Sequence, residues 1–180
     1  MQFALNLTET HSEVWGLCIE VFESIISEVT AIPQVGKAWF GRRVPTITTR
    51  EAFLQEGEKV QSSRRGIALH SLPQPWDQVS IFLKKYITCE GRHQTIYNSE
   101  LPLLSHLRHG TLLNIPYYLL HDLCHMAAFV QAAKHPFASL THHGLIKLII
   151  LRTLAQHNIT WEQFTTRAQQ PAPLPGVQVE

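Results

Sequence analysis

The sequence predicts a single compact multi-helix domain of the all-α class, and three observations support this prediction. Apolar residues recur at three- and four-residue steps, side chains that start helices precede these segments, and no segment shows the sustained alternation typical of a β-strand. A length of 180 residues suits one domain with one core. We expect a helical domain over residues 1–168, best supported over 73–168, with a long irregular connection at about 33–72 and a flexible, proline-rich tail at 169–180.

The first helix is expected to begin at the segment Thr10-His-Ser-Glu13. This is a capping-box pattern, in which the threonine hydroxyl and the glutamate carboxylate each accept a hydrogen bond from a backbone N–H at the start of a helix. Apolar residues follow at helical spacing, and the pattern ends before Pro33. The predicted buried stripe consists of Val14, Leu17, Cys18, Val21, Phe22, Ile25 and Val29.

The next segment is expected to be an irregular connection. Prolines and glycines are dense up to Pro45, which disfavours regular structure there. A short helix can begin at Thr48 or Thr49 and reach Glu58.

Helix-start signals are clearest in the second half of the chain. Proline in the first turn, or a serine, threonine or asparagine at the cap, suits a helix start because the first backbone N–H groups have no partner within the helix. The predicted starts are Trp76 after Pro73-Gln-Pro75, Asn98 or Ser99, Asn114 followed by Pro116, Thr141, and the capping box Thr160-Trp-Glu-Gln163. The predicted ends are a break at 89–95, then Gly110, Ala133, His157 and Ala168.

Composition and charge favour an intracellular protein, in the cytoplasm or the nucleus. The formal net charge is +1, so no excess of positive charge indicates a nucleic-acid or anionic-membrane partner. The three cysteines, Cys18, Cys89 and Cys124, are too few and too scattered for a disulfide framework. The N-terminal residues do not resemble a signal or transit peptide, and no apolar run reaches the roughly 18 residues of a membrane span.

The strongest candidate for a chemical site is the segment His121-Asp-Leu-Cys-His125. Two histidines four residues apart lie about one turn apart on the same side of a helix, where both imidazoles can bind one zinc ion. Asp122 takes the place of the general-base glutamate of HExxH metalloproteases. One hypothesis is therefore a zinc-dependent hydrolase with His121 and His125 as metal ligands.

The alternative is that these histidines are ordinary residues of an amphipathic helix. At about 100° per residue they fall opposite an apolar arc. That arc contains Ile115, Leu119, Leu123, Met126 and Val130. A third zinc ligand has no recognisable spacing, although His142, His143 and His157 come later in the sequence, which holds 11 histidines.

Other catalytic classes find little support in the sequence. It contains no Gly-x-Ser-x-Gly nucleophile motif and no glycine-rich phosphate loop. Asp77 and Asp122 are the only aspartates, so a set of acidic residues that could hold paired catalytic cations is missing.

A further alternative is a single-stranded nucleic-acid-binding module. Trp39-Phe40 stands beside Arg42-Arg43, and stacking aromatic rings next to cations are typical of such sites.

Several segments of residues 73–165 succeed one another in a distinctive order. They are the tryptophan-led helix Pro75–Ile87, the segment Glu100–Gly110, the turn Leu113-Asn-Ile-Pro-Tyr-Tyr-Leu-Leu120 into a long helix, and the apolar segment His142–Leu154. This order resembles the plant transposon protein domain, which is found in open reading frames of plant retroelements and transposon-derived genes. Weaker agreement extends upstream, around residues 37–65.

The resemblance implies a helical, transposable-element-derived protein without a catalytic signature, and it transfers no site residue and no cofactor. The leading interpretation is accordingly a non-catalytic packing or assembly module that associates with itself or with other proteins of the element.

Overall fold

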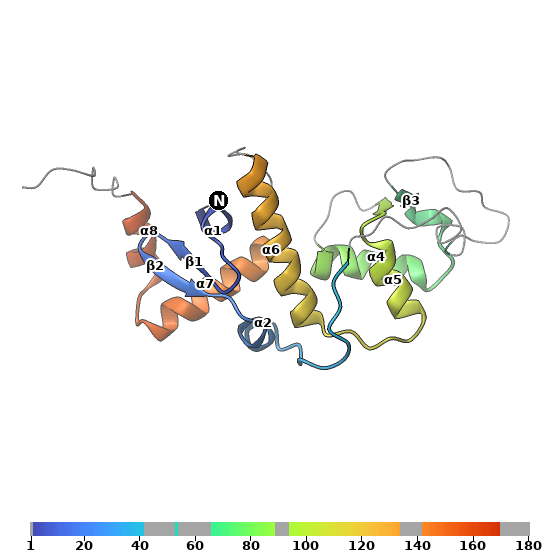
Figure 1. The fold of residues 1–180 in the computed structure, drawn as a ribbon, viewed down its shortest axis with the longest axis horizontal. Helices are drawn as coiled ribbons and strands as arrows, with labels where there is room; N and C mark the ends of the chain where they lie inside the picture. Colours follow the sequence, from blue (N-terminus) through green and yellow to red (C-terminus); the bar gives the residue numbers. More distant parts are fainter. Residues whose placement is uncertain (1, 42–52, 54–65, 89–93, 134–141, 170–180) are drawn as a thin grey trace, which may run out of the picture.

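The computed structural model describes residues 2–41, 53, 66–88, 94–133 and 142–169, and it is predominantly helical (Figure 1). The helical character that the sequence predicts is therefore confirmed. The expectation of a purely all-α domain is wrong, because the described residues also form two antiparallel sheets of two strands each.

The elements are short apart from two longer helices in the second half of the chain. In chain order they are α1 (Gln2–Leu5), β1 (His11–Val14), β2 (Leu17–Glu20), α2 (Glu23–Thr30), β3 (Gly66–Ala68), a 3₁₀ turn (Leu69–Ser71), α4 (Trp76–Leu83), a π-helical turn (Lys84–Thr88), β4 (Thr95–Tyr97), α5 (Leu101–Arg108), α6 (Ile115–Ala133), α7 (His143–Gln156) and α8 (Trp161–Gln169). None of the helices in these residues combines the length and the apolar character that crossing a membrane requires.

A β-hairpin replaces the first half of the predicted N-terminal helix. β1 pairs antiparallel with β2, and Val14 lies opposite Leu17 next to the turn. The turn residues Trp15 and Gly16 have φ values of 50° and 73°, and two positive φ values are what a two-residue hairpin turn needs. Every second residue is buried along both strands. Val14 and Leu17 of the predicted buried stripe thus lie on the inner face of a hairpin, whereas Cys18 and Phe22 of that stripe are exposed.

Helix α2 corresponds to the second half of the predicted helix. It begins at Glu23, buries Ile25 and Ile26, and is followed by Ala31 in the left-handed conformation. The predicted capping box at Thr10 is wrong, because this residue precedes a strand and its carbonyl accepts a hydrogen bond of 2.8 Å from the N–H of Val21.

The connection expected to be irregular, at about 33–72, contains a strand and a 3₁₀ turn near its end, at residues 66–71. β3 pairs with β4, and Gly66 lies opposite Tyr97. A Cβ atom at Gly66 would lie 1.9 Å from the carbonyl oxygen of Ile96, so the close approach of the strands requires glycine. The short helix predicted within 48–58 lies outside the described residues, apart from Phe53.

Three predicted helix starts in the second half are confirmed. α4 begins at Trp76. α6 comes directly after Asn114, whose Oδ1 accepts a hydrogen bond of 3.1 Å from the N–H of Tyr117. α8 comes after a complete capping box, in which Thr160 Oγ1 accepts from the N–H of Gln163 at 3.2 Å and Gln163 Oε1 accepts from the N–H of Thr160 at 2.8 Å.

Two other helix starts are preceded by residues that were not predicted as caps. Glu100, instead of Asn98 or Ser99, comes directly before α5, and His142 comes directly before α7. The predicted cap Thr141 and the proline-rich tail lie outside the described residues.

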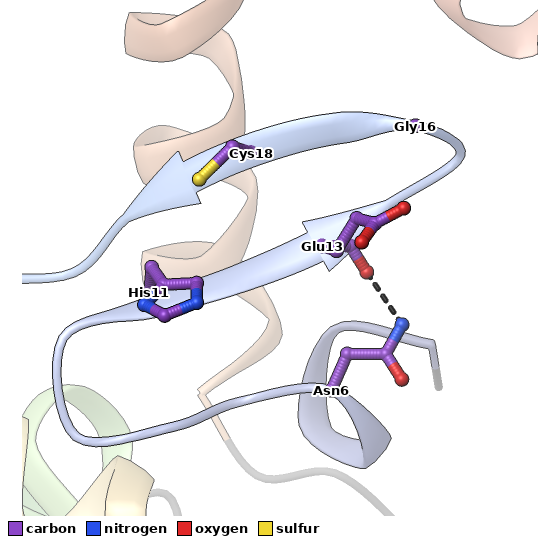
Figure 2. A pocket seen from close by; sticks show the side chains of 5 residues that line it. All are labelled: Asn6, His11, Glu13, Gly16 and Cys18. Carbon is purple, nitrogen blue, oxygen red and sulfur yellow. Dashed lines mark hydrogen bonds between the residues drawn. The ribbon is translucent and has the colours of Figure 1, made fainter.

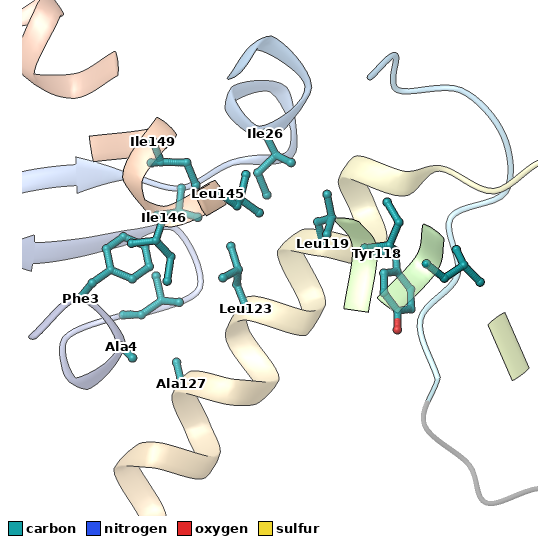
Figure 3. Close-up of a cluster of buried hydrophobic side chains, with 14 of the residues drawn as sticks. Phe3, Ala4, Ile26, Tyr118, Leu119, Leu123, Ala127, Leu145, Ile146 and Ile149 are labelled. Carbon is teal, nitrogen blue, oxygen red and sulfur yellow. The ribbon is translucent and has the colours of Figure 1, made fainter. Parts of the chain in front are cut away.

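Helix α6 lies between two groups of elements (Figure 1). We call α1, β1, β2, α2, α7 and α8 the first lobe, and β3, β4, α4 and α5 the second lobe. Leu119, Leu123 and Ala127 of α6 face the core of the first lobe (Figure 3). The side chains that meet them include Phe3, Ala4, Ile26, Leu145, Ile146 and Ile149. Because α6 lies between the two lobes, it is covered on more than one side.

Candidate functional site

The candidate site predicted from the sequence lies on α6, at His121, Asp122 and His125. Asp122 is completely buried, with 0% of its surface exposed. His121 is half-buried and His125 is exposed. The three side chains therefore meet different surroundings, although they share one stretch of helix.

Asp122 forms a buried pair with His142. Asp122 Oδ2 lies 2.8 Å from His142 Nε2, and the exposed fractions of the two side chains are 0% and 1%. His142 has a φ of 61°, a conformation that costs free energy in any residue with a Cβ. Its carbonyl accepts a hydrogen bond of 3.0 Å from the N–H of Ile146, which starts α7. The pair thus joins the middle of α6 to the beginning of α7.

This pairing gives Asp122 a structural role. A carboxylate in the protein interior needs a hydrogen-bonding partner, because the loss of hydration costs several kcal/mol per ion. His142 supplies that partner through Nε2. In this arrangement Asp122 is directed toward α7, so it does not stand beside the two imidazoles as a general base would.

The imidazoles of His121 and His125 both lie against Phe40. The ring centroids are 5.8 Å apart for Phe40 and His121, and 6.1 Å apart for Phe40 and His125. Tyr117 adds a second ring contact to His121 at 4.2 Å. Phe40 is held near α6 because the backbone of Lys37 bonds to the residues on either side of Leu113, ahead of the helix.

The described residues contain no group of three or more histidine, cysteine, aspartate and glutamate side chains that could hold a metal ion. Of the histidines considered as a third ligand, His142 is paired with Asp122, whereas His143 and His157 are exposed. His121 and His125 are brought together with an aromatic ring, and no third ligand is brought to them within this part of the chain.

Cys124 also lies within the predicted motif, and it is half-buried. Burial, and to a smaller extent the charge of Glu9, raise the pKa of its thiol above the usual value. The neutral thiol is thereby favoured, and a neutral thiol is a poor nucleophile and a poor metal ligand.

A second buried ion pair lies in the second lobe, and it was not predicted from the sequence. Lys84 Nζ lies 2.7 Å from Glu100 Oε2, and the side chains are 1% and 4% exposed. Glu100 also accepts hydrogen bonds from Thr88 Oγ1 at 2.8 Å and from the N–H of Tyr97 at 2.7 Å. Lys84 Nζ stands 4.6 Å from the centroid of the Tyr97 ring.

The position of Lys84 contains one signal of its burial. Lys84 lies on the buried side of residues 83–88, together with Leu83, Ile87 and Thr88. Its neighbour Lys85 is exposed. A lysine on an apolar side predicts a buried partner. Glu100 could not be chosen from the sequence, because it lies 16 residues further along the chain.

Trp39 and Phe40, the proposed stacking pair for single-stranded nucleic acid, make contacts within the protein. Trp39 lies 4.5 Å from His106 and 6.2 Å from Tyr118 between ring centroids, and Phe40 lies 5.4 Å from Tyr118. Burial, followed by the charges of Lys37 and His109, lowers the pKa of His106. Arg42 and Arg43 lie outside the described residues.

The outer face of the hairpin lines an open pocket of about 670 Å³. Its lining includes Asn6, His11, Glu13, Gly16 and Cys18 (Figure 2). Asn6 Nδ2 donates a hydrogen bond of 2.6 Å to the carbonyl of Glu13, which fixes the end of α1 beside β1. The pocket depends on the hairpin, so a sequence interpretation with a helix in this place could not predict it.

Comparisons of the chain with known protein families, with curated proteins and with solved structures find no match.

Proposed function

We propose that this protein is a non-catalytic helical module that assembles with copies of itself. The observation that carries the proposal is the state of the four buried side chains Lys84, Glu100, Asp122 and His142. They form two pairs with separations of 2.7 and 2.8 Å, and each member of a pair is almost completely shielded from solvent. Groups enclosed in this way stabilise a fold and cannot meet a dissolved substrate.

The surface supports an assembly role. Phe82 and Tyr86 lie 5.0 Å apart between ring centroids, so their exposed rings form an apolar patch of the kind found at interaction sites. Large apolar side chains are also exposed on other helices. The exposed fractions are 56% for Phe82, 55% for Tyr86, 64% for Phe129, 43% for Leu148 and 37% for Leu151.

The proposal includes an origin in a plant transposable element. It is supported by the resemblance of residues 73–165 to the plant transposon protein domain. The described helices α4 to α7 succeed one another in the order of the segments on which that resemblance depends.

Sedimentation velocity on the full chain over a wide range of concentrations tests the proposal. We expect the weight-average mass to rise with concentration toward that of a dimer, because the exposed apolar side chains lose contact with water on association. A mass that stays at the monomer value at every concentration would contradict the proposal.

A further inference from the structure

Two tryptophans from distant parts of the chain contact Phe164, where α8 lies beside the hairpin (Figure 1). The ring centroid of Trp15, in the hairpin turn, is 4.7 Å from that of Phe164, and the centroid of Trp161, at the start of α8, is 5.8 Å from it. Phe164 is 1% exposed, whereas Trp15 and Trp161 are 37% and 41% exposed. We call the exposed parts of these two indoles the Trp15–Trp161 surface.

The backbone at Trp15 does not favour an aromatic residue. Its φ is 50°, which bulky residues rarely adopt, and asparagine before glycine is the preferred pair in a two-residue turn with two positive φ values. The turn therefore gives no reason for a tryptophan. What the tryptophan contributes is its side chain, which packs on Phe164 and leaves part of the indole accessible.

The surroundings of Trp161 on α8 are apolar. At about 100° per residue, the charged side chains of Glu162 and Arg167 are directed about 100° or more away from Trp161 around the helix. Thr165, one turn further on, uses its hydroxyl on the helix itself, since it donates to the carbonyls of Trp161 and Glu162 at 3.0 and 3.1 Å. No charged group of α8 thus stands beside the exposed indole.

The segment that follows α8 has the complementary chemistry. Residues 170–176 read Gln-Pro-Ala-Pro-Leu-Pro-Gly and carry no charge. Three prolines within five residues favour the polyproline II conformation, whose backbone carbonyls make no hydrogen bonds within the segment. Segments of this kind bind to aromatic rings. The indole N–H groups of Trp15 and Trp161 have no hydrogen-bond partner among the described residues, so they are suited to donate to these carbonyls.

The segment is long enough to reach the surface. Trp161 lies eight residues before Gln169, the last residue of α8, and thus about 12 Å back along the helix. At about 3.1 Å per residue, the four residues from Gln169 to Pro173 cover the same distance. Two more residues allow for the reversal of direction and bring Pro175 level with Trp161.

We propose that residues 170–176 run back along α8 of the same chain and cover the Trp15–Trp161 surface. A covalently attached segment is favoured over a separate partner, because a short tether gives it an effective concentration on the order of millimolar. This inference is independent of the assembly function proposed above, and it concerns a different surface.

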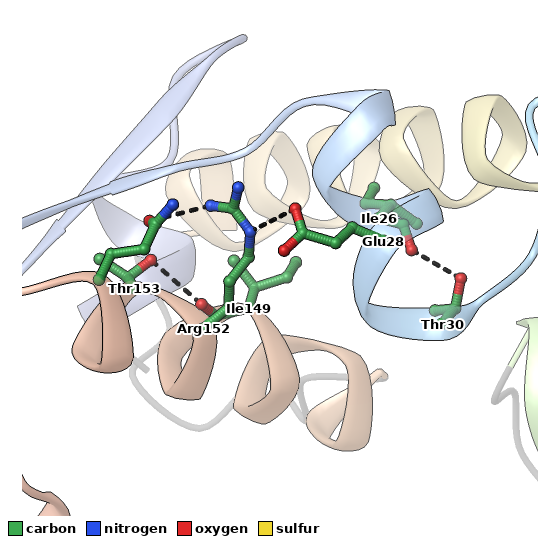
Figure 4. Close-up of polar contacts among 7 residues, drawn as sticks. Ile26, Glu28, Thr30, Ile149, Arg152 and Thr153 are labelled. Carbon is green, nitrogen blue, oxygen red and sulfur yellow. Dashed lines mark hydrogen bonds and ion pairs between the residues drawn. The ribbon is translucent and has the colours of Figure 1, made fainter.

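Both parts of the surface are held in place before the segment binds. Gln2 Oε1 accepts a hydrogen bond of 3.3 Å from the N–H of Trp15, which ties the turn to α1. The helix before α8 is joined to α2 by the hydrogen bond of 2.7 Å that Arg152 donates to Glu28 (Figure 4). Binding to a preformed surface loses less conformational entropy than binding to a mobile one.

Nuclear magnetic resonance on the full chain tests the proposal. We expect amide order parameters of about 0.8 at Leu174 and Gly176, since values of this size indicate a rigid backbone and values below about 0.6 a flexible one. The values should be the same at two protein concentrations that differ tenfold, because the occupant belongs to the same molecule.

The triple variant Pro171→Ser/Pro173→Ser/Pro175→Ser removes the polyproline preference and leaves the described residues unchanged. Its order parameters at Leu174 and Gly176 should fall below about 0.6. The indole N–H signals of Trp15 and Trp161 should shift, while those of Trp39 and Trp76 stay in place as internal controls.

Trp15→Asn removes one indole and gives the turn a residue that it favours, so a loss of the turn does not obscure the result. The segment should become flexible here as well. The control is Phe82→Ser, because Phe82 is an aromatic residue of α4 that is 56% exposed and lies outside the Trp15–Trp161 surface. It should leave the segment ordered, and urea unfolding establishes that each variant is folded.

The other outcomes overturn the proposal. Order parameters below about 0.6 at Leu174 and Gly176 in the wild type would show that the segment is not bound. Order that rises with protein concentration would show that the segment binds a second copy. If Trp15→Asn leaves the segment ordered, or if Phe82→Ser releases it, the segment is bound elsewhere.

Discussion

At the scale of single residues, the buried Lys84–Glu100 pair determines how the second lobe tolerates substitution. Glu100 accepts hydrogen bonds from two side chains and one backbone N–H, all between 2.7 and 2.8 Å. Because these donors have given up their hydration, removal of the carboxylate leaves a buried ammonium group without a counter-charge.

We expect Glu100→Ala to lower the free energy of unfolding by about 3–5 kcal/mol, since one partner of a buried pair is removed. Urea unfolding measures this change. Glu28→Ala is the control, because Glu28 forms an ion pair with Arg152 at 2.7 Å while its side chain is 59% exposed. The control should lose about 1 kcal/mol or less. Equal losses in the two variants would show that the Lys84–Glu100 pair is not enclosed.

The thiol of Cys124 should react slowly. Burial is the main cause of its raised pKa, and the charge of Glu9 adds to it, so less thiolate is present at a given pH. In a Cys89→Ser background at about pH 8, iodoacetamide should modify Cys124 more slowly than the exposed Cys18. In concentrated urea the two rates should converge, because unfolding removes the burial. A folded protein with equal rates would contradict the raised pKa.

At the scale of elements, the same sequence motif has two outcomes. The capping box at Thr160 forms as predicted, whereas the similar pattern at Thr10 precedes a strand. The difference lies in the residues after the motif, because Trp15-Gly16 allows a turn with two positive φ values only a few residues after Thr10. Ser12 then donates a buried hydrogen bond of 2.7 Å to the carbonyl of Phe3, which ties β1 to α1.

We expect Gly16→Ala to destabilise the hairpin by about 1 kcal/mol, because an alanine resists a positive φ. A Cβ atom at Gly16 meets nothing within 4 Å, so backbone strain is the only effect. Gly144→Ala is the matched control, since its surroundings are equally open and it lies in a helix. Urea unfolding at low protein concentration should show no loss for the control. A Gly16→Ala variant as stable as the wild type would contradict the positive φ of residue 16 in this turn.

On helix α6, the contacts of His121 and His125 with Phe40 predict the outcome of a metal test. We expect purified protein to contain substoichiometric zinc, and its Tm to be unchanged by EDTA, because an aromatic ring lies against both imidazoles. Elemental analysis and thermal unfolding measure these two quantities. The double variant His121→Ala/His125→Ala should have the same metal content as the wild type. Stoichiometric zinc that disappears in this variant would establish the zinc hypothesis instead.

At the scale of the whole molecule, α6 connects the two lobes and is covered from both. The apolar arc predicted from the sequence does face the first lobe, through Leu119 and Leu123. The opposite face was predicted to be the less apolar one, yet Tyr118 and Asp122 on that side are 2% and 0% exposed. Helical periodicity shows which residues share a face, and it cannot show how many faces are covered.

The Asp122–His142 pair should stabilise the molecule by holding α7 against α6. We expect Asp122→Ala and His142→Ala each to lower the free energy of unfolding by about 3–5 kcal/mol, since each removes one partner of a buried pair. The double variant should lose less than the sum, with a coupling of about 1–3 kcal/mol. The same comparison of two single variants and a double variant at the surface pair of Glu28 and Arg152 is the control. Its coupling energy should be about 1 kcal/mol or less. Additive losses at Asp122 and His142 would refute the pair.

The sequence by itself determined the predominantly helical fold and the starts of α4, α6 and α8. These features depend on neighbours within one or two turns, such as the amide of Asn114 or the side chain of Gln163, so local chemistry is sufficient. Only the tertiary structure decided that residues 11–20 form a hairpin and that Lys84 and Asp122 are enclosed with Glu100 and His142. The physical reason is that burial of a side chain depends on segments that are distant along the chain, and a polar group reaches its partner only after those segments have packed.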